Sequence, residues 1–98
     1  MTDNLHADVA TDRPDRYAKQ LVSHLGRRNG GEWSAETRSG WIDLNDGKVT
    51  VTTDEGVLHL RVDGDGESLD HLADVVERHL VRFGQQDEFA VHWQRGTE

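Results

Sequence analysis

The sequence predicts an α+β domain, a two-layer sandwich in which two helices cover one face of a mainly antiparallel sheet, in the order β-α-β(3-4)-α-β. Two stretches repeat apolar residues at steps of three and four, as helices with one buried face do. Between them, residues 32–63 alternate apolar and polar residues, with short polar links that contain glycine. The 98 residues suffice for one core, so we expect a single domain over 1–98 with frayed ends at 1–4 and 95–98.

The second helix, expected over residues 69–83, has the clearer pattern. Ser68 is a good N-cap for it, and Gly84 stands where a helix would end. The apolar stripe of this helix comprises Leu69, Leu72, Val75, Val76, Leu80 and Phe83. After a polar link, Phe89, Val91 and Trp93 alternate with polar residues, which predicts a last strand over residues 88–94.

The first helix is expected over residues 13–28. Asp12 can cap it, and Pro14 lies in its first turn, where the missing N–H costs nothing. The helix should end at Gly26 or at the cluster of Asn29, Gly30 and Gly31. Its apolar stripe comprises Tyr17, Ala18, Leu21, Val22 and Leu25.

Alternating apolar residues predict a short first strand over residues 5–11 and four more over 32–35, 40–44, 48–53 and 57–62. One apolar parity along the last two of these favours an antiparallel sheet with one covered face. The acidic run at residues 63–67 is too short for a calcium-binding EF-hand loop and continues into the helix cap, so it is interpreted as a solvated turn.

Composition excludes several function classes. Nineteen Asp and Glu against eleven Lys and Arg give a formal charge of −8, which argues against nucleic acid and anionic membranes as partners. The absence of cysteine excludes disulfides and thiolate sites. No secretory signal and no membrane-length apolar run is present, so a cytoplasmic protein is expected. No catalytic motif is found, and no catalytic residue is assigned.

Two histidines mark the predicted helices. His79 falls inside the apolar arc of the second helix, and we interpret it as a core histidine bonded to a carbonyl or another side chain. The alternative is a ligand or acid/base group facing a pocket. His24 lies beside Tyr17 at the margin of the first stripe. If the two helices are neighbours, His24, His79, Tyr17 and Arg82 would line a ligand site in their groove.

The other histidines of interest share the polar parity of their strands. His6, His59 and His92, together with Asp8, would lie on the open face of the sheet if their strands were adjacent. Imidazole and carboxylate groups suit a divalent metal such as zinc, nickel or iron. The alternative is an ordinary solvated sheet face, and the closely spaced histidine pairs typical of metal sites are absent.

Three segments carry a resemblance to a known family: residues 10–14, residues 20–25, and residues 78–84 followed by Asp87, Glu88 and Trp93. Over residues 7–93 the chain resembles small bacterial proteins grouped as domain of unknown function 2218, which are common in actinobacteria. The family has no established activity. Its members occur near siderophore-interacting and iron-uptake proteins, which implies a metal-linked role. His24 and His79 match the family's motif histidines, whereas Arg27 stands where relatives often carry another histidine.

The function that we favour from the sequence is a non-catalytic binding or assembly module, with a homodimer through the open sheet face or an edge strand as one form. The competing hypothesis is a metal- or siderophore-linked accessory protein in bacterial iron handling. A minor alternative is an enzyme acting on a small molecule between the helices. The identity of the cofactor, and of the small-molecule or protein partner, stays open.

Overall fold

The computed structural model describes residues 3–44, 47–64, 66–83, 91 and 93–97. Its elements in chain order are β1 (Asp3–Ala10), α1 (Pro14–Asn29), β2 (Gly31–Ser34), β3 (Ser39–Leu44), β4 (Gly47–Asp54), β5 (Val57–Gly64), α2 (Gly66–Phe83) and β6 (Gln94–Thr97). The strands form one antiparallel sheet in the order β2-β3-β4-β5-β1-β6. The predicted α+β class is confirmed, with four strands between the two helices.

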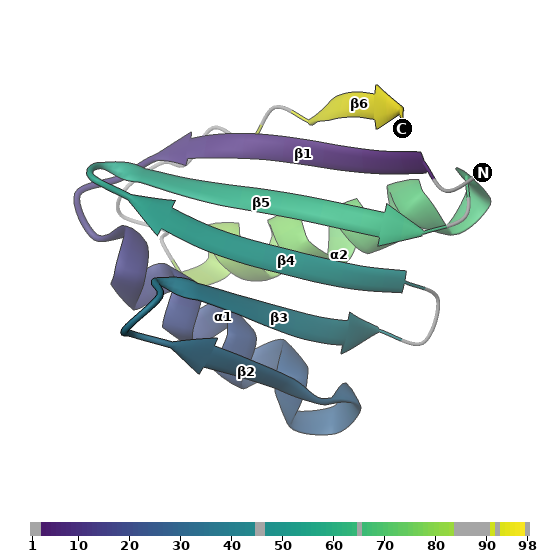
Figure 1. The fold of residues 1–98 in the computed structure, drawn as a ribbon. Coiled ribbons are helices and arrows are strands. Elements are labelled where there is room, and N and C mark those ends of the chain that lie inside the picture. The colour runs from purple at the N-terminus through teal and green to yellow at the C-terminus, as the bar shows by residue number, and fades with distance from the viewer. Residues whose placement is uncertain (1–2, 45–46, 65, 84–90, 92, 98) are drawn as a thin grey trace.

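Both helices lie on one face of the sheet and leave the other face open (Figure 1). α1 packs on β2, β3 and β4, whereas α2 packs mainly on β5 and β1. Their apolar stripes meet the apolar side of the strands in one core. The largest fully buried side chains are Leu21, Ile42, Leu58, Leu60, Leu69, Leu80, Val9, Val49, Val51, Val62 and Val76.

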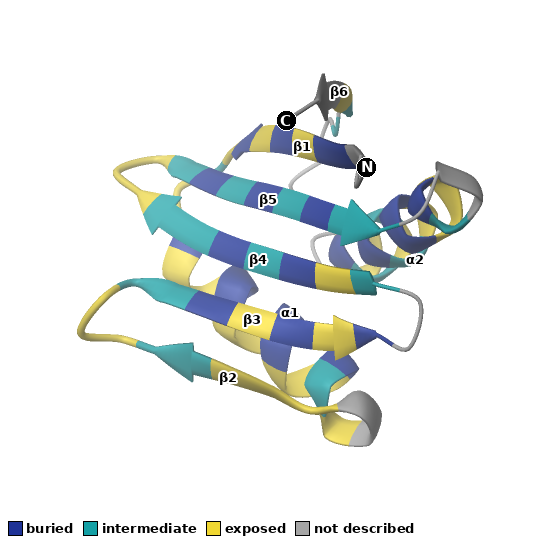
Figure 2. Ribbon diagram, turned by 45° about the vertical axis from the view of Figure 1, so that its right-hand side comes forward, coloured by how far each residue is buried: buried dark blue, intermediate teal, exposed yellow. Residues whose placement is uncertain are grey.

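Burial alternates along the central strands, as Figure 2 shows. Val62 of β5 is paired with Leu5 of β1 and with Val49 of β4, so apolar residues on three adjacent strands face the helices together. A register shift of one residue would turn all of them to the open face. The buried side of the sheet therefore fixes the strand register.

The N-terminal ends of the helices differ in detail from the expectations, whereas the predicted end of the first helix at the cluster of Asn29, Gly30 and Gly31 is confirmed. Arg13, not Asp12, occupies the N-cap position of α1, and its backbone N–H donates to Thr11 Oγ1 at 3.2 Å. At the other end Gly30 has a φ of 100° and donates its N–H to the carbonyl of Gly26 at 2.8 Å. α2 begins at Gly66, so Ser68 lies in its first turn and is not the N-cap.

Residues near both ends of the chain belong to strands of the sheet, where frayed ends are expected from the sequence. β1 begins at Asp3, and Asn4 is only 6% exposed because it lies between β5 and β6. Residues 95–97 belong to β6, which pairs with β1. Backbone pairing orders both segments although their side chains carry no apolar pattern.

The predicted last strand is placed too early. Val91 and Trp93 lie outside any strand, and β6 begins at Gln94; Phe89 lies outside the described residues. Val91 and Trp93 both pack against the core, and Trp93 Nε1 donates to Glu77 Oε1 of α2 at 3.1 Å. Their alternation therefore reflects packing against the core rather than strand pairing.

Candidate functional site

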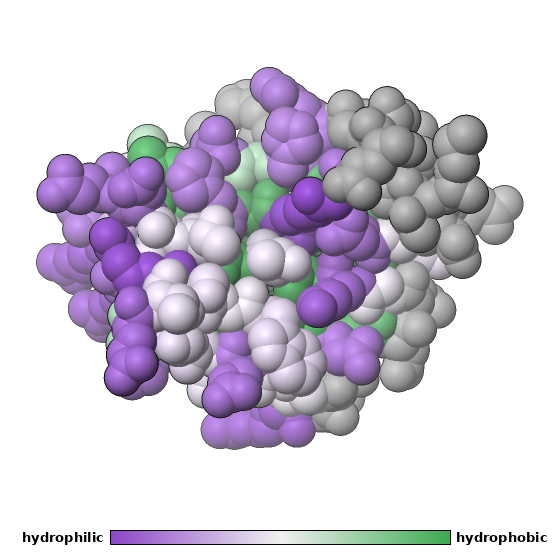
Figure 3. Space-filling model, viewed as in Figure 1, coloured by the Kyte–Doolittle hydropathy of each residue, from purple (hydrophilic) through white to green (hydrophobic). Residues whose placement is uncertain are grey.

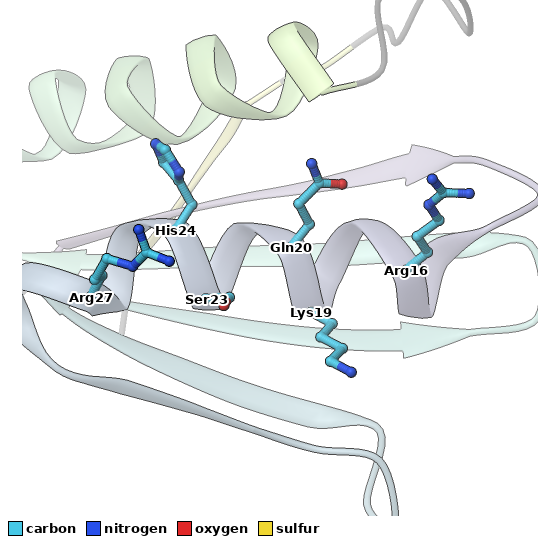
Figure 4. A pocket seen from close by; sticks show the side chains of 6 residues that line it. All are labelled: Arg16, Lys19, Gln20, Ser23, His24 and Arg27. Carbon is cyan, nitrogen blue, oxygen red and sulfur yellow. The ribbon is translucent and has the colours of Figure 1, made fainter.

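A depression of about 340 Å³ lies on the outer surface of α1. We call it the basic groove, and its lining residues are Arg16, Lys19, Gln20, Ser23, His24 and Arg27 (Figure 4). All six side chains are exposed, and none of them is a carboxylate. The apolar stripe of the same helix faces the sheet, so the groove occupies the side of α1 that packing leaves to solvent.

Helical spacing places the cations of the groove in one row along α1. Arg16, Lys19, Ser23 and Arg27 follow one another at steps of three and four residues, which places them along one side of the helix. The rise of 1.5 Å per residue spreads Arg16 and Arg27 over about 16 Å. Figure 4 shows His24 and Gln20 pointing towards α2, and Lys19 pointing to the other side of α1.

The cations of the groove lack partners within the described part of the chain. Arg38 pairs with Asp15, Arg61 with Asp63, and Arg78 with Asp74. Arg16, Lys19 and Arg27 make no ion pair with any residue that the structure describes. The chain as a whole has a formal charge of −8, so a group of unpaired cations gives this part of the surface a charge opposite in sign to that of the whole protein.

His24 connects the groove to α2. Its ring lies against the ring of His79, with centroids 5.0 Å apart and planes tilted by 48°. His79 is half-buried, and its Nδ1 donates to the carbonyl of Val75 at 2.7 Å, the type of backbone partner that the sequence suggested. The two motif histidines therefore meet where α1 and α2 come together.

The other two residues proposed for this site, Tyr17 and Arg82, do not line the basic groove. Tyr17 is 6% exposed and belongs to the core stripe of α1. Arg82 is exposed on α2, where it lines a separate depression with Glu77, Arg78 and Val81. The basic groove is therefore lined by His24 but not by Tyr17 or Arg82.

The histidines expected on the open face do not gather around one point. His59 Nδ1 donates to Asp8 Oδ1 at 2.5 Å, across the pair of β5 with β1. His6 lies opposite Arg61 in the next row of the same pair, and His92 is outside the described residues. Among the residues that the structure describes, no group of three or more His, Asp or Glu side chains could hold a metal ion.

The open sheet face is polar rather than apolar. It faces the viewer in Figure 3, where neutral and hydrophilic residues cover most of the described surface. Trp41 is 40% exposed on this face, the one large aromatic side chain classed as exposed among the described residues, and Lys48 Nζ lies 5.8 Å from the centroid of its ring. Neighbouring positions are held by Thr50, Thr52 and Arg61. This is not the flat apolar face that would indicate assembly through the sheet.

One carboxylate of α1 has a perturbed pKa. The hydroxyl of Thr53 donates to Asp15 Oδ1, and Arg38 Nε approaches the same oxygen to 3.2 Å. The Thr53 hydrogen bond and then Arg38 hold the pKa of Asp15 below its usual range, against the opposing effect of burial. Asp15 therefore pairs with Arg38, and it makes no ion pair with Arg16 or Lys19.

The sequence and the fold both relate this chain to known proteins. Residues 6–94 match the family model DUF2218, described as "Uncharacterized protein conserved in bacteria". The chain belongs to this family. A solved structure of the same fold, described as "NMR structure of PA4090 from Pseudomonas aeruginosa", aligns with a TM-score of 0.75 and 25% identity over 96% of each chain. A comparison with curated proteins finds no match. Neither described helix of this DUF2218 chain is long and apolar enough to span a bilayer.

The sequence reasoning missed Arg16, Lys19 and Arg27 as a set. A signal was present, because their steps along α1 define a stripe opposite to Tyr17, Leu21 and Leu25. The negative total charge conceals this stripe, since a total says nothing about where the cations lie. The sequence marks Arg27 only as a departure from the histidine that relatives carry.

Proposed function

We propose that this chain is a small non-catalytic binding module whose site is the basic groove and whose ligand is an anion. The observation that carries the proposal is a depression with three cations, no carboxylate in its lining and no ion pair for those cations within the described residues. Guanidinium and ammonium groups bind carboxylates and phosphates through charge-assisted hydrogen bonds. Gln20 and Ser23 add neutral donors beside them.

The expected affinity is modest. Each exposed ion pair contributes less than about 1 kcal/mol, so three of them contribute less than about 3 kcal/mol, which corresponds to a dissociation constant on the order of 10 mM for a small anion. Screening should weaken binding when the ionic strength rises from about 0.05 M to about 0.5 M, because the Debye length falls well below 10 Å. A larger ligand that reaches Arg16 and Arg27 together would bind more tightly.

Calorimetric titration with citrate tests the proposal. The variant Lys19→Gln/Arg27→Gln should lose about tenfold in affinity, which corresponds to about 1.4 kcal/mol. The matched control, Arg13→Gln/Lys48→Gln, removes the same two charges from exposed positions outside the groove and should bind like the parent protein. Equal losses in the two variants would mean that overall charge, not the groove, attracts the anion.

A second candidate is a metal-linked accessory role, which the contact between His24 and His79 favours. Imidazole is a ligand for zinc, nickel and iron, and two rings on two helices can provide part of a coordination shell. Native mass spectrometry of the untagged protein, purified without chelator, tests this candidate. A metal adduct that disappears in His24→Ala would support it, and a bare chain after incubation with zinc or nickel would count against it.

A further inference from the structure

The cations of the basic groove also border a second depression, of about 320 Å³, between α1 and the edge strand β2. Lys19, Ser23 and Arg27 line both depressions. The second one is completed by Val22, Gly26, Gly31, Glu32 and Trp33. The positive charge on α1 therefore extends to the edge of the sheet.

β2 presents unused backbone groups at this edge. The N–H of Asp43 donates to the carbonyl of Gly30, which sets the alternation of the β2–β3 ladder. Glu32 and Ser34 then share the hydrogen-bonded positions with β3, whereas the N–H and C=O groups of Gly31 and Trp33 point away from it. Those are the groups that an additional strand would use.

Side-chain parity places the cations next to that additional strand. Trp33 is paired with Gly40, and the position of a Cβ at Gly40 is 3.0 Å from the Trp33 ring and 3.2 Å from Val22 of α1. The side chain of Trp33 therefore lies on the side of the sheet that α1 covers. Residues of an added strand opposite Gly31 and Trp33 would lie on the same side, beside Arg27 and Lys19. Glu32 also lines this depression but has the opposite parity on β2, and it makes no ion pair with Lys19 or Arg27 among the described residues.

From this geometry we infer that the partner is an extended acidic peptide segment of another protein, which adds to β2 as a seventh strand and directs its carboxylates to Lys19 and Arg27. The inference rests on the proposed anion-binding function and specifies the class of ligand. About five extended residues cover the 16 Å over which the cations of α1 are spread. A small anion cannot reach all of them.

A second copy of this chain is a poorer occupant of the edge. Pairing of β2 with β2 of another copy would bring the Lys19 and Arg27 side chains of the two chains together, and like charges repel. Charge complementarity therefore favours a different, acidic chain.

The test uses a fluorescein-labelled ten-residue peptide of alternating glutamate and valine, with anisotropy as the readout on the full chain. The parent protein should bind it, and Lys19→Gln/Arg27→Gln should weaken binding at least about tenfold, whereas Arg13→Gln/Lys48→Gln should not. Two further peptides carry N-methyl groups, either on the glutamate amides or on the valine amides. In antiparallel addition the residues opposite Gly31 and Trp33 donate to β2, so methylation of the glutamate amides should abolish binding and methylation of the valine amides should not.

The outcomes separate the two claims. If methylation of the valine amides abolishes binding and methylation of the glutamate amides does not, the result would still support strand addition, in the parallel orientation. Binding that depends on Lys19 and Arg27 but tolerates both methylation patterns would overturn strand addition and leave anion binding intact. Binding that ignores the Lys19→Gln/Arg27→Gln change would overturn the proposed function itself.

Discussion

Replacing His79 by alanine tests whether the histidine contact stabilises the helix pair. The change removes the hydrogen bond from Nδ1 to the Val75 carbonyl, which contributes about 1 kcal/mol. It also removes the ring contact with His24, a tilted pair with centroids 5.0 Å apart, for which about 0.5–1.5 kcal/mol is expected. The free energy of unfolding should fall by about 2 kcal/mol, and the melting temperature by about 10 °C for a domain of this size.

A double-mutant cycle isolates the ring contact. The stabilities of His24→Ala, His79→Ala and the double variant are measured by urea unfolding, followed by the fluorescence of the tryptophans that pack against the core. A coupling energy of about 0.5–1 kcal/mol is expected. The control is His71→Ala, on the exposed surface of the same helix, which should change stability by less than about 0.5 kcal/mol.

Two results would refute this reasoning. A coupling energy near zero would mean that His24 and His79 touch without stabilising one another. A His79→Ala variant as stable as His71→Ala would mean that the bond to Val75 is exchanged for water at no cost.

Two further predictions concern stability. Asp15→Asn should cost less than about 1 kcal/mol at pH 7, because Thr53 and Arg38 act on an exposed carboxylate. Folding lowers the pKa of Asp15, so this stabilisation is present above the unfolded pKa of about 3.9 and is lost as the pH falls through the folded pKa. Thermal melts of the variant and the parent protein should therefore have the same midpoint at pH 2. A difference in melting temperature that grew at acid pH would mean that folding raises the pKa instead. Gly47→Ala should destabilise the fold by about 1–3 kcal/mol in urea unfolding, because a Cβ there would lie within 2.5 Å of Leu72 Cδ1 and closer still to the carbonyl oxygen of Asp63. A Gly47→Ala variant of parental stability would show that β4 and α2 can move apart freely.

Periodicity predicted most of the fold because burial dictates it. The apolar stripes of α1 and α2 and the alternation in β4 and β5 each reflect one face turned to the same core. The last strand was predicted at the wrong place because Val91 and Trp93 pack against the core without belonging to a strand. The pairing of β6 with β1 uses backbone groups, which every residue other than proline carries in full, so it leaves no apolar pattern in the sequence. The predicted N-caps at Asp12 and Ser68 were wrong because a helix can begin one or two residues away from a suitable capping residue.

The candidate site was less accessible from the sequence. The meeting of His24 and His79 could be proposed from two helical wheels, but the contact needs the placement of both helices on the sheet. The second depression needs tertiary placement too, since Lys19 and Arg27 lie beside β2 only because the chain turns back at Gly30. A net charge is a sum over the chain, and it conceals a local cluster of the opposite sign.

The central claim is that the cations of α1 form an anion site, and a citrate titration followed by ¹H–¹⁵N chemical shifts tests it most directly. The account predicts saturable shifts centred on the amides around Lys19, Ser23 and Arg27, reduced in Lys19→Gln/Arg27→Gln. Shifts centred on the open sheet face around Trp41 and Lys48, or small changes spread evenly over the chain, would contradict it.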